Sequence, residues 1–218
     1  MKISEIFSSI NGEVSRQHQG SLCTFVRFAG CNFADHPCVY CDTRYALTDS
    51  MSMEMSAEEV IQAIKALHNT NIVITGGEPL LQQSEFLALI YELSQNYFNV
   101  SIETNGSLVI PYWHLRNVTW VVDYKMPSSG NFDRMVKQNY IRLRPEDIVK
   151  FVIANQNDFV TAVNIVNDLR HLSMTIAFSP CSPALPPETL YEWMQCSDVL
   201  RKKGAVLSLQ FHKVIGVK

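Results

Sequence analysis

The sequence lacks any long apolar run. No stretch of its 218 residues approaches the roughly 18 consecutive apolar residues of a transmembrane helix, and the N-terminal MKISEIFSSINGE has no apolar core like that of a signal peptide. Basic excess is also absent, because the net charge is −3 with 18% charged residues, which disfavours binding to a nucleic-acid backbone. We therefore expect a cytoplasmic protein that acts on a small molecule, with no membrane partner and no direct nucleic-acid partner.

The cysteine content does not suggest a disulfide framework. Six cysteines in an unsecreted chain of this length are better explained as metal ligands or buried thiols, because the cytosol keeps thiols reduced. We expect Cys23, Cys181 and Cys196 to be buried. With 47% hydrophobic residues the chain can bury one sizeable core, so we expect a single α/β domain over residues 1–218.

Three cysteines cluster in FAGCNFADHPCVYCDT at residues 28–43, with six residues between Cys31 and Cys38 and two between Cys38 and Cys41. Three thiolates cannot complete a four-cysteine zinc site, and no Cys or His pair at finger spacing follows downstream. Three thiolates can hold a [4Fe-4S] cluster that keeps one iron open, so the spacing favours a cluster-binding loop. Cys38 and Cys41 alone would also fit a redox pair, half a zinc site or buried thiols.

Apolar strand patterns alternate with helical patterns along most of the chain. Ser56 and Glu59 form the sequence signature of a capping box before a helix. We expect strands over residues 22–28, 71–75, 99–104, 118–124, 148–153, 175–178 and 206–212, and helices over 56–69, 84–97, 158–170 and 188–203. This alternation predicts a parallel sheet with outer helices, curled into a complete or partial barrel. Residues 127–144 are expected to form a mobile loop with one short helix.

Polar groups follow the ends of several predicted strands. Gly76, Gly77 and Glu78 follow one strand, Glu103 ends the next, and Lys125 follows a third. In a parallel barrel such groups gather on one rim, where ligands bind. An ordinary turn would also account for the glycine pair, and a turn carboxylate for Glu103.

Other polar residues allow two interpretations. Glu13 suits a solvated loop, and His212 suits a strand histidine with its hydrogen bonds satisfied. Arg27 lies among apolar neighbours and is either paired at a surface or directed into a site. Thr43 could cap a helix or offer an oxygen ligand to a hard cation.

Several motifs carry a family resemblance. FSSINGE (7–13), VRFAGC (26–31) with CVYCDT (38–43), TGGEP (75–79), ETNG (103–106) and LSLQFHKVIGV (207–217) resemble the radical S-adenosylmethionine superfamily and, within it, the 7-carboxy-7-deazaguanine synthase family of queuosine biosynthesis, a tRNA modification pathway. Two features depart from the pattern. Six residues rather than the superfamily's usual three separate Cys31 from Cys38, and Asp123, Tyr124 and Lys125 replace a Ser-Pro-Lys triplet.

The resemblance implies a fold and a set of site residues. The fold would be a partial or modified (β/α) barrel of the radical SAM type, with a [4Fe-4S] cluster on Cys31, Cys38 and Cys41 and Mg²⁺ on Thr43. The implied S-adenosylmethionine contacts are Tyr40, Asp42, Gly76, Gly77, Glu78, Glu103 and Lys125, and the implied substrate contacts are Ile10, Asn11, Gly12, Glu13, Arg27, Thr75, His212 and Lys218.

The resemblance also implies a reaction. The enzyme would be a carbon–nitrogen lyase that converts 6-carboxy-5,6,7,8-tetrahydropterin to 7-carboxy-7-deazaguanine with loss of ammonia, using the cluster, S-adenosylmethionine and Mg²⁺. A reductant such as flavodoxin or ferredoxin and a homodimeric state are implied as well. Two alternatives stay open: an activating enzyme that acts on a protein partner, and a zinc or iron–sulfur electron-transfer module without a reaction of its own.

Overall fold

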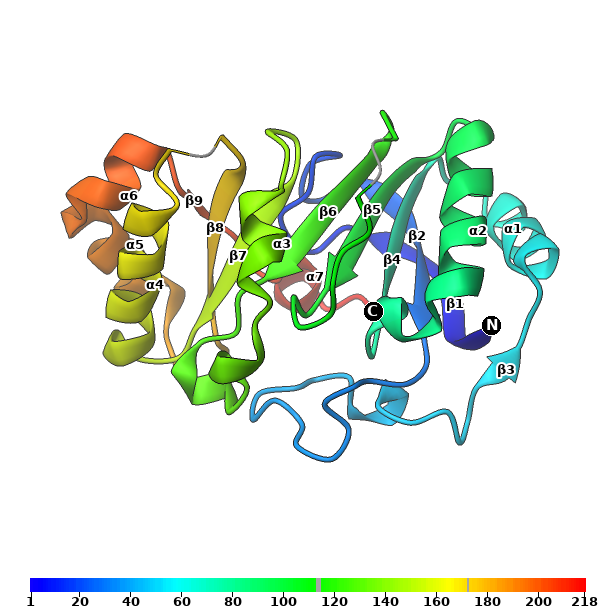
Figure 1. Cartoon of the computed structure of the whole chain (residues 1–218), viewed down its shortest axis with the longest axis horizontal. Helices are drawn as coiled ribbons and strands as arrows, with labels where there is room; N and C mark the ends of the chain where they lie inside the picture. The colour runs from blue at the N-terminus through cyan, green and yellow to red at the C-terminus, as the bar shows by residue number, and fades with distance from the viewer. Residues whose placement is uncertain (113–114, 172) are drawn as a thin grey trace.

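A computed structural model describes residues 1–112, 115–171 and 173–218. Its strands form one sheet in the order β3-β1-β2-β4-β5-β6-β7-β8-β9 (Figure 1). They are β1 (Lys2–Ile10), β2 (Leu22–Phe28), β3 (Met53–Glu54), β4 (Asn71–Gly76), β5 (Asn99–Thr104), β6 (Val118–Asp123), β7 (Ile148–Ile153), β8 (Thr175–Pro180) and β9 (Val206–Leu207). Among the described strands β3 and β9 are the edges, so the sheet is an open, partial barrel.

Parallel pairing runs from β2 through β4, β5, β6, β7 and β8 to β9. Helices α1 (Ala57–Ala66), α2 (Gln83–Gln95), α4 (Gln156–Asp168), α5 (Pro187–Cys196) and α6 (Asp198–Lys203) connect the strands. Figure 1 shows α1 and α2 at one end of the sheet and α4 to α6 at the other. Ser56 and Glu59 make the predicted capping box at the start of α1. The prediction of an α/β partial barrel is confirmed.

The first strands depart from the expected parallel pattern. β1 is antiparallel to β2, and β3 is antiparallel to β1. The chain between β1 and β2, residues 11–21, contains no helix. A parallel pair needs a long crossover, usually helical, so a connection of this kind suits antiparallel neighbours.

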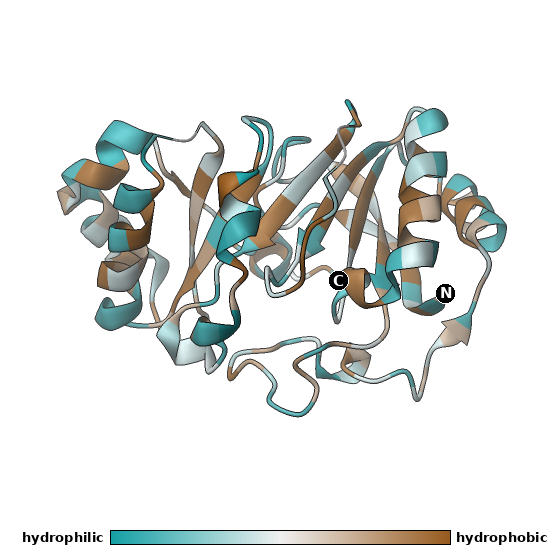
Figure 2. Cartoon of the chain, in the orientation of Figure 1, coloured by the Kyte–Doolittle hydropathy of each residue, from teal (hydrophilic) through white to brown (hydrophobic). Residues whose placement is uncertain are grey.

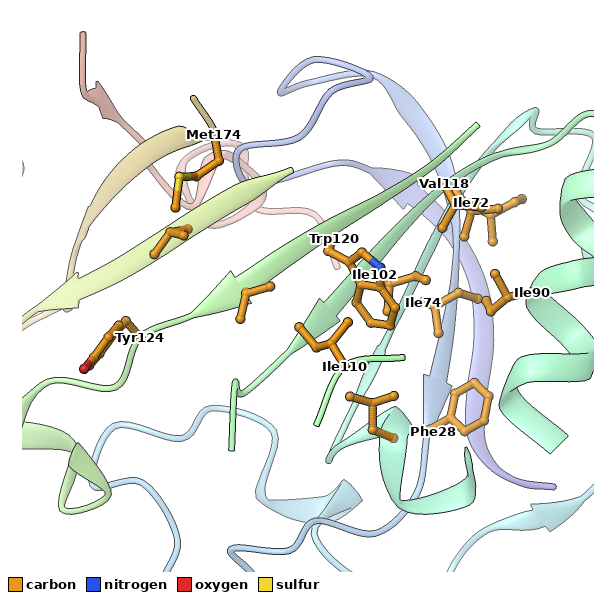
Figure 3. Packing of buried hydrophobic residues seen from close by; sticks show 14 of the residues in the cluster. Phe28, Ile72, Ile74, Ile90, Ile102, Ile110, Val118, Trp120, Tyr124 and Met174 are labelled. Atoms are coloured by element: carbon orange, nitrogen blue, oxygen red, sulfur yellow. The ribbon is translucent and has the colours of Figure 1, made fainter. Parts of the chain in front are cut away.

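Alternation along the strands separates an apolar face from a polar one. The apolar face carries Phe28, Ile74, Ile102, Trp120 and Phe151, which are at most 4% exposed, and α2 packs its Ile90 against it (Figure 3). Figure 2 shows hydrophobic and hydrophilic residues alternating along the helices, and in α2 the buried ones are Phe86, Leu89, Ile90 and Leu93. The other face presents polar side chains at the carboxyl ends of the strands.

The loop at residues 11–20 covers part of this second face. Val14 packs against Val121, Ile148 and Ala177, and Ser101 donates a hydrogen bond to Gln17 Oε1 at 2.6 Å. A loop that looks solvated in the sequence therefore folds against the inner surface of the partial barrel.

The C-terminal quarter differs from prediction in two places. The helix expected over 188–203 is two helices. Ser197 has an extended backbone that ends α5, and its hydroxyl accepts a hydrogen bond from the Leu200 N–H at the start of α6. The strand expected over 206–212 has two residues, followed by α7 (Phe211–Ile215). Phe178 pairs with Leu207, so a longer β9 would run beside Pro180, which has no N–H to donate.

The segment 127–144 has more structure than a loop with one short helix. It contains η3 (Pro127–Ser129), η4 (Phe132–Arg134) and α3 (Lys137–Ile141), and it buries Ser129, Asn131 and Asn139. The remaining short helices are η1 (Arg44–Ala46) and η2 (Pro79–Gln82). None of the described helices has the length and apolar character needed to cross a membrane.

The cysteines outside the 28–43 segment match the prediction in two cases of three. Cys23 and Cys181 are buried, as expected, whereas Cys196 is exposed. Cys196 is the last residue of α5, on the surface of the helical layer.

Candidate active site

A cavity of about 430 Å³ opens at the carboxyl ends of the parallel strands. It is bordered by strand ends, by the segment that carries the three cysteines, and by the C-terminal segment. Of the site residues predicted from the sequence, it is lined by Asn11, Gly12, Glu13, Arg27, Cys31, Cys38, Tyr40, Cys41, Asp42, Thr43, Thr75, Gly76, Gly77, Glu103, Lys125, His212 and Lys218. Ile10 and Glu78 do not line it.

The cysteine loop, residues 29–43, runs along the bottom of the view in Figure 1 and brings all three sulfurs to this cavity. Short turns fold it, with the Ala34 N–H donating to the Cys31 carbonyl and the Cys41 N–H to the Cys38 carbonyl, each at 3.0 Å. All three cysteines are free. Burial raises the pKa of the Cys31 and Cys38 thiols, and metal binding would favour their thiolates.

The donor set fits an iron–sulfur cluster. Cys31 Sγ accepts hydrogen bonds from the Phe33 N–H at 3.4 Å and Asn105 Nδ2 at 4.0 Å, and Cys38 Sγ accepts one from Asn131 Nδ2 at 3.6 Å. Hydrogen bonds to sulfur tune such clusters. In the described part of the chain, no three His, Cys, Asp or Glu side chains are placed to share a single metal ion. A cluster instead takes each thiolate on a different iron, which three separate thiols on one wall can provide.

The glycine pair after β4 allows this strand to approach the cysteine loop. Gly76 has φ +140°, and a Cβ on Gly77 would lie 2.0 Å from the Gly30 carbonyl oxygen. The Gly77 N–H donates to the Phe28 carbonyl at 3.0 Å, and the Glu78 N–H to the Gly30 carbonyl at 2.8 Å. Only a residue without a side chain fits at position 77.

Glu78 takes a different place from the predicted cofactor contact. Its side chain is fully buried, where its oxygens accept hydrogen bonds from Thr104 Oγ1 at 2.8 Å, from the Asn105 N–H at 2.7 Å and from the Leu80 N–H at 3.1 Å. Burial raises the pKa of Glu78 to about 7, and these hydrogen bonds oppose the shift. Glu78 therefore joins the end of β4 to the end of β5, and it does not line the cavity.

Tyr40 places a buried hydroxyl group in the cavity wall. Tyr40 Oη is buried and has no hydrogen bond among the described residues, and Lys125 Nζ lies 5.9 Å from its ring centroid. A buried hydroxyl without a partner is costly unless a ligand satisfies it. The wall at Tyr40 thus fits a polar cofactor such as S-adenosylmethionine.

Opposite charges line the inner face of the sheet. Lys150 Nζ contacts Glu13 Oε2 and lies 3.2 Å from Asp123 Oδ1, while Asp123 Oδ2 lies 2.5 Å from Lys125 Nζ. The four side chains are between 10% and 17% exposed. Burial lowers the pKa of Lys150, but Asp123 and Glu13 reverse this and hold it well above its ordinary value. Each of these four side chains thus has a partner of opposite charge.

Glu103 lies beside this network without an ion-pair partner among the described residues. Thr75 Oγ1 donates to Glu103 Oε2 at 2.7 Å. Burial raises the pKa of Glu103, and the nearby Glu13 adds to the shift. The carboxyl group is thus available to exchange a hydrogen bond with a ligand. Glu103 was predicted as a cofactor contact, and it lies next to Thr75, which was predicted as a substrate contact.

Arg27 lines the cavity from β2, where it stands in register with Thr75 of β4. Its Nε donates to Glu5 Oε1 at 2.8 Å, and its guanidinium carbon lies 5.9 Å from the ring centroids of Phe7 and Tyr45. Glu5 also accepts from Tyr45 Oη at 2.7 Å and contacts Lys218 Nζ. Burial raises the pKa of Glu5, but these hydrogen bonds outweigh it and leave the pKa lowered. The terminal nitrogens of Arg27, with no described partner, can bind a carboxylate.

His212 reaches the cavity from α7, not from a strand. Burial lowers its pKa, so the imidazole is neutral near pH 7. Gly12 makes room for the ring, because a Cβ there would lie 1.8 Å from His212 Nδ1. The Phe211 N–H donates to the Gly12 carbonyl at 2.7 Å, which fixes α7 to the 11–20 loop.

Thr43 and Asp42 place oxygen atoms on the same wall. Thr43 precedes η1, but its side chain makes no capping hydrogen bond there. Its hydroxyl donates to Asp42 Oδ1 at 3.0 Å, and Asp42 Oδ2 lies 2.7 Å from Lys213 Nζ. The helix-cap interpretation of Thr43 is not supported, and the hydroxyl fits a hard cation that prefers oxygen.

Several cavity residues were missed in the sequence. Lys150 carried a usable signal, because a lysine inside the apolar run IVKFVI resembles Arg27 inside LCTFVRF. Asp123 also carried one, since it ends a buried strand. Gln210 and Lys213 lie within the motif LSLQFHKVIGV, but nothing in the motif singled them out, because their positions depend on where α7 packs.

Comparison with known proteins agrees with this geometry. The pattern of the Radical SAM superfamily matches residues 25–115. A 7-carboxy-7-deazaguanine synthase from Clostridium acetobutylicum is 34% identical, covering 98% of this chain and 95% of that protein. One from Chlorobaculum tepidum is 36% identical, covering 99% and 94%.

A solved structure has the same fold. The crystal structure of QueE from Escherichia coli superposes with a TM-score of 0.72 at 22% identity, covering 97% of this chain and 94% of that one. With the nearly full-length relatives above, these similarities show that the chain belongs to the 7-carboxy-7-deazaguanine synthase family of the radical SAM superfamily.

Proposed function

We propose that the chain converts 6-carboxy-5,6,7,8-tetrahydropterin to 7-carboxy-7-deazaguanine with loss of ammonia. The observation that carries the proposal is that three free cysteines and Arg27 line one cavity in a member of this family. An activating enzyme for a protein partner would not need Arg27 and Lys218 to converge with Glu5 at the end of the cavity.

The cofactor end of the cavity would be formed by the cysteine loop and the ends of β4 and β6. Cys31, Cys38 and Cys41 would hold the cluster. Tyr40 and Lys125 would contact S-adenosylmethionine, and the backbone at Gly76 and Gly77 would lie close to it. When bound, the cluster and this cofactor supply the 5′-deoxyadenosyl radical that starts the reaction. The protein's own task is to position both molecules and to exclude water.

The substrate end would be formed by side chains from both ends of the chain. Arg27 would pair with the pterin carboxylate through its terminal nitrogens, because a guanidinium fork matches a carboxylate. Glu103 and Thr75 would bind ring nitrogens or oxygens from β5 and β4. Glu13, held by Lys150 and by Gln210 Nε2 at 3.1 Å, and neutral His212 would complete the polar contacts.

Magnesium and the partners are part of the proposal. Thr43 Oγ1 would hold Mg²⁺, with water and substrate oxygens as further ligands. If so, Thr43→Ala should weaken the Mg²⁺ dependence of turnover without loss of cluster colour, and Thr43→Ser should retain it. An Mg²⁺ dependence unchanged in Thr43→Ala would remove the assignment. A flavodoxin or ferredoxin as reductant and a homodimer remain predictions.

The main test is reconstitution of the chain with iron and sulfide under anaerobic conditions. The reduced protein, given S-adenosylmethionine, Mg²⁺ and the carboxytetrahydropterin, should release the deazaguanine product and 5′-deoxyadenosine, measured by chromatography. Cys31→Ala should abolish both, whereas Cys196→Ala, at an exposed cysteine outside the cavity, should abolish neither. A wild-type protein that takes up zinc but no iron and sulfide would refute the proposal.

A further inference from the structure

The enlarged segment between the first two cysteines, residues 32–37, is held from outside the cysteine loop. At its start, Asn105 Nδ2 donates to Asn32 Oδ1 at 2.9 Å, and Asn32 Nδ2 donates to Ser107 Oγ at 2.7 Å. Two residues after its end, the Val39 N–H donates to the Ser129 carbonyl at 3.1 Å. Figure 1 shows the 127–136 segment beside the cysteine loop. The extra residues are thus tied to two neighbouring segments.

Asn131, in the 127–136 segment, donates a hydrogen bond to one of the predicted cluster ligands. Its side chain donates from Nδ2 to the His36 carbonyl at 3.1 Å and to Cys38 Sγ at 3.6 Å. The residue is 2% exposed, and its N–H donates to Ser129 Oγ at 3.0 Å. The amide is therefore buried, fixed at its backbone and directed at a thiol that lines the cavity.

Arg134 fixes the orientation of this amide. Its Nη1 donates to Asn131 Oδ1 at 3.1 Å, so the amide nitrogen must face Cys38. Its Nη2 donates to the Asn32 carbonyl at 3.0 Å, and its guanidinium carbon lies 4.3 Å from the Phe33 ring centroid. One arginine thus connects the start of the enlarged segment to the residue that contacts its end.

We propose that Asn131, oriented by Arg134, is a positioning residue that stabilises the reduced cluster and slows its loss. The inference rests on the proposed function, because it needs Cys38 to be a cluster ligand. A cluster gains negative charge when it is reduced, and a donor on its thiolate stabilises that charge. Without the Asn131 amide, the cluster should be harder to reduce and its loop less firmly held.

The effect should be visible in a redox titration. Loss of one such donor is expected to lower the ratio of reduced to oxidised cluster about tenfold at a fixed potential, equivalent to about 59 mV for a one-electron couple. A role limited to folding would change cluster content but leave the midpoint potential of the loaded protein unchanged.

The test compares the wild-type chain with three variants, each reconstituted anaerobically with iron and sulfide. Asn131→Leu keeps the approximate shape and removes the donor. Arg134→Met removes the group that orients it from an exposed position, and Lys137→Met removes a nearby exposed charge as a matched control. The readouts are iron and sulfide per chain, the midpoint potential from paramagnetic resonance of the reduced cluster, and the rate of bleaching in air.

We expect a lower midpoint and faster bleaching in Asn131→Leu, a smaller shift of the same sign in Arg134→Met, and no change in Lys137→Met. Wild-type potentials and bleaching rates in the first two variants overturn the inference. If Asn131→Leu loads no cluster, the midpoint potential and the bleaching rate of Arg134→Met test the inference alone. Equal shifts of the midpoint potential in Arg134→Met and Lys137→Met would mean that only the net charge matters, and they would also overturn the inference. A wild-type chain without a cluster refutes the proposed function instead.

Discussion

Gly77→Ala should separate the cysteine loop from β4. The added Cβ would lie 2.0 Å from the Gly30 carbonyl oxygen and 2.8 Å from that of Ala46. Both contacts are to backbone, so no side chain can rotate away. Recovering an ordinary contact of 3.4 Å requires the strand end and the loop to move apart by about 1.4 Å.

The cost follows from what this movement breaks. Overpacking typically costs about 1–3 kcal/mol. The hydrogen bonds from Gly77 to Phe28 and from Glu78 to Gly30 would add about 1 kcal/mol each if lost. For a domain of this length, a total of about 3–5 kcal/mol corresponds to a fall in Tm of roughly 6–20 °C. The displaced loop should also take up less iron.

The assay is thermal unfolding of the protein without added iron, followed by iron and sulfide analysis after reconstitution. Gly204→Ala is the control, because Gly204 has φ +67° with open space around it. It should lose about 1–2 kcal/mol from the left-handed backbone yet load a normal cluster. A Gly77→Ala protein with wild-type Tm and iron content would refute the close approach of β4 to the cysteine loop.

Two further predictions concern the substrate end. Gly12→Ala should push the His212 ring out of the cavity. Substrate binding should weaken about tenfold, which is the value of one good hydrogen bond. Calorimetry should find no further loss of affinity when His212→Ala is added to Gly12→Ala. Lys150→Met should lower the free energy of unfolding by about 3–5 kcal/mol at pH 7, because it leaves the Glu13 carboxylate without its buried partner. Urea unfolding of the variant and of the wild type at pH 7 measures this loss, and equal free energies of unfolding would contradict the pairing.

Much of the sheet could be predicted from local pattern. The predicted bounds of β2, β5 and β7 match the structure residue for residue, because buried parallel strands are continuous apolar runs that end at polar or glycine residues. The cavity residues on these strands followed from the same rule, since groups at the carboxyl ends of parallel strands share one rim.

The remaining site residues depend on contacts that a local pattern does not contain. Glu13 and Lys150 are separated by 137 positions, so nothing near either one indicated the other. His212 was predicted on a strand, yet it lies on α7 because β8 ends at Pro180. Glu78 was predicted as a cofactor contact by its position after two glycines, and nothing near it in the sequence indicated that its carboxylate accepts hydrogen bonds from Thr104 and Asn105 at the end of β5.

An open sheet needs another means of enclosing a ligand, and this chain uses its C-terminal segment. After β9, at one edge, the chain continues through α7 towards β1, near the other edge (Figure 1). There the Ser9 hydroxyl contacts the Lys218 carbonyl, and Lys213 pairs with Asp42 of the cysteine loop. The substrate end can therefore form only when both edges of the sheet are in place. This explains why all of its predicted contacts except Thr75 come from the first 30 residues and the last seven, while the cofactor end is built by the cysteine loop and the ends of β4 and β6.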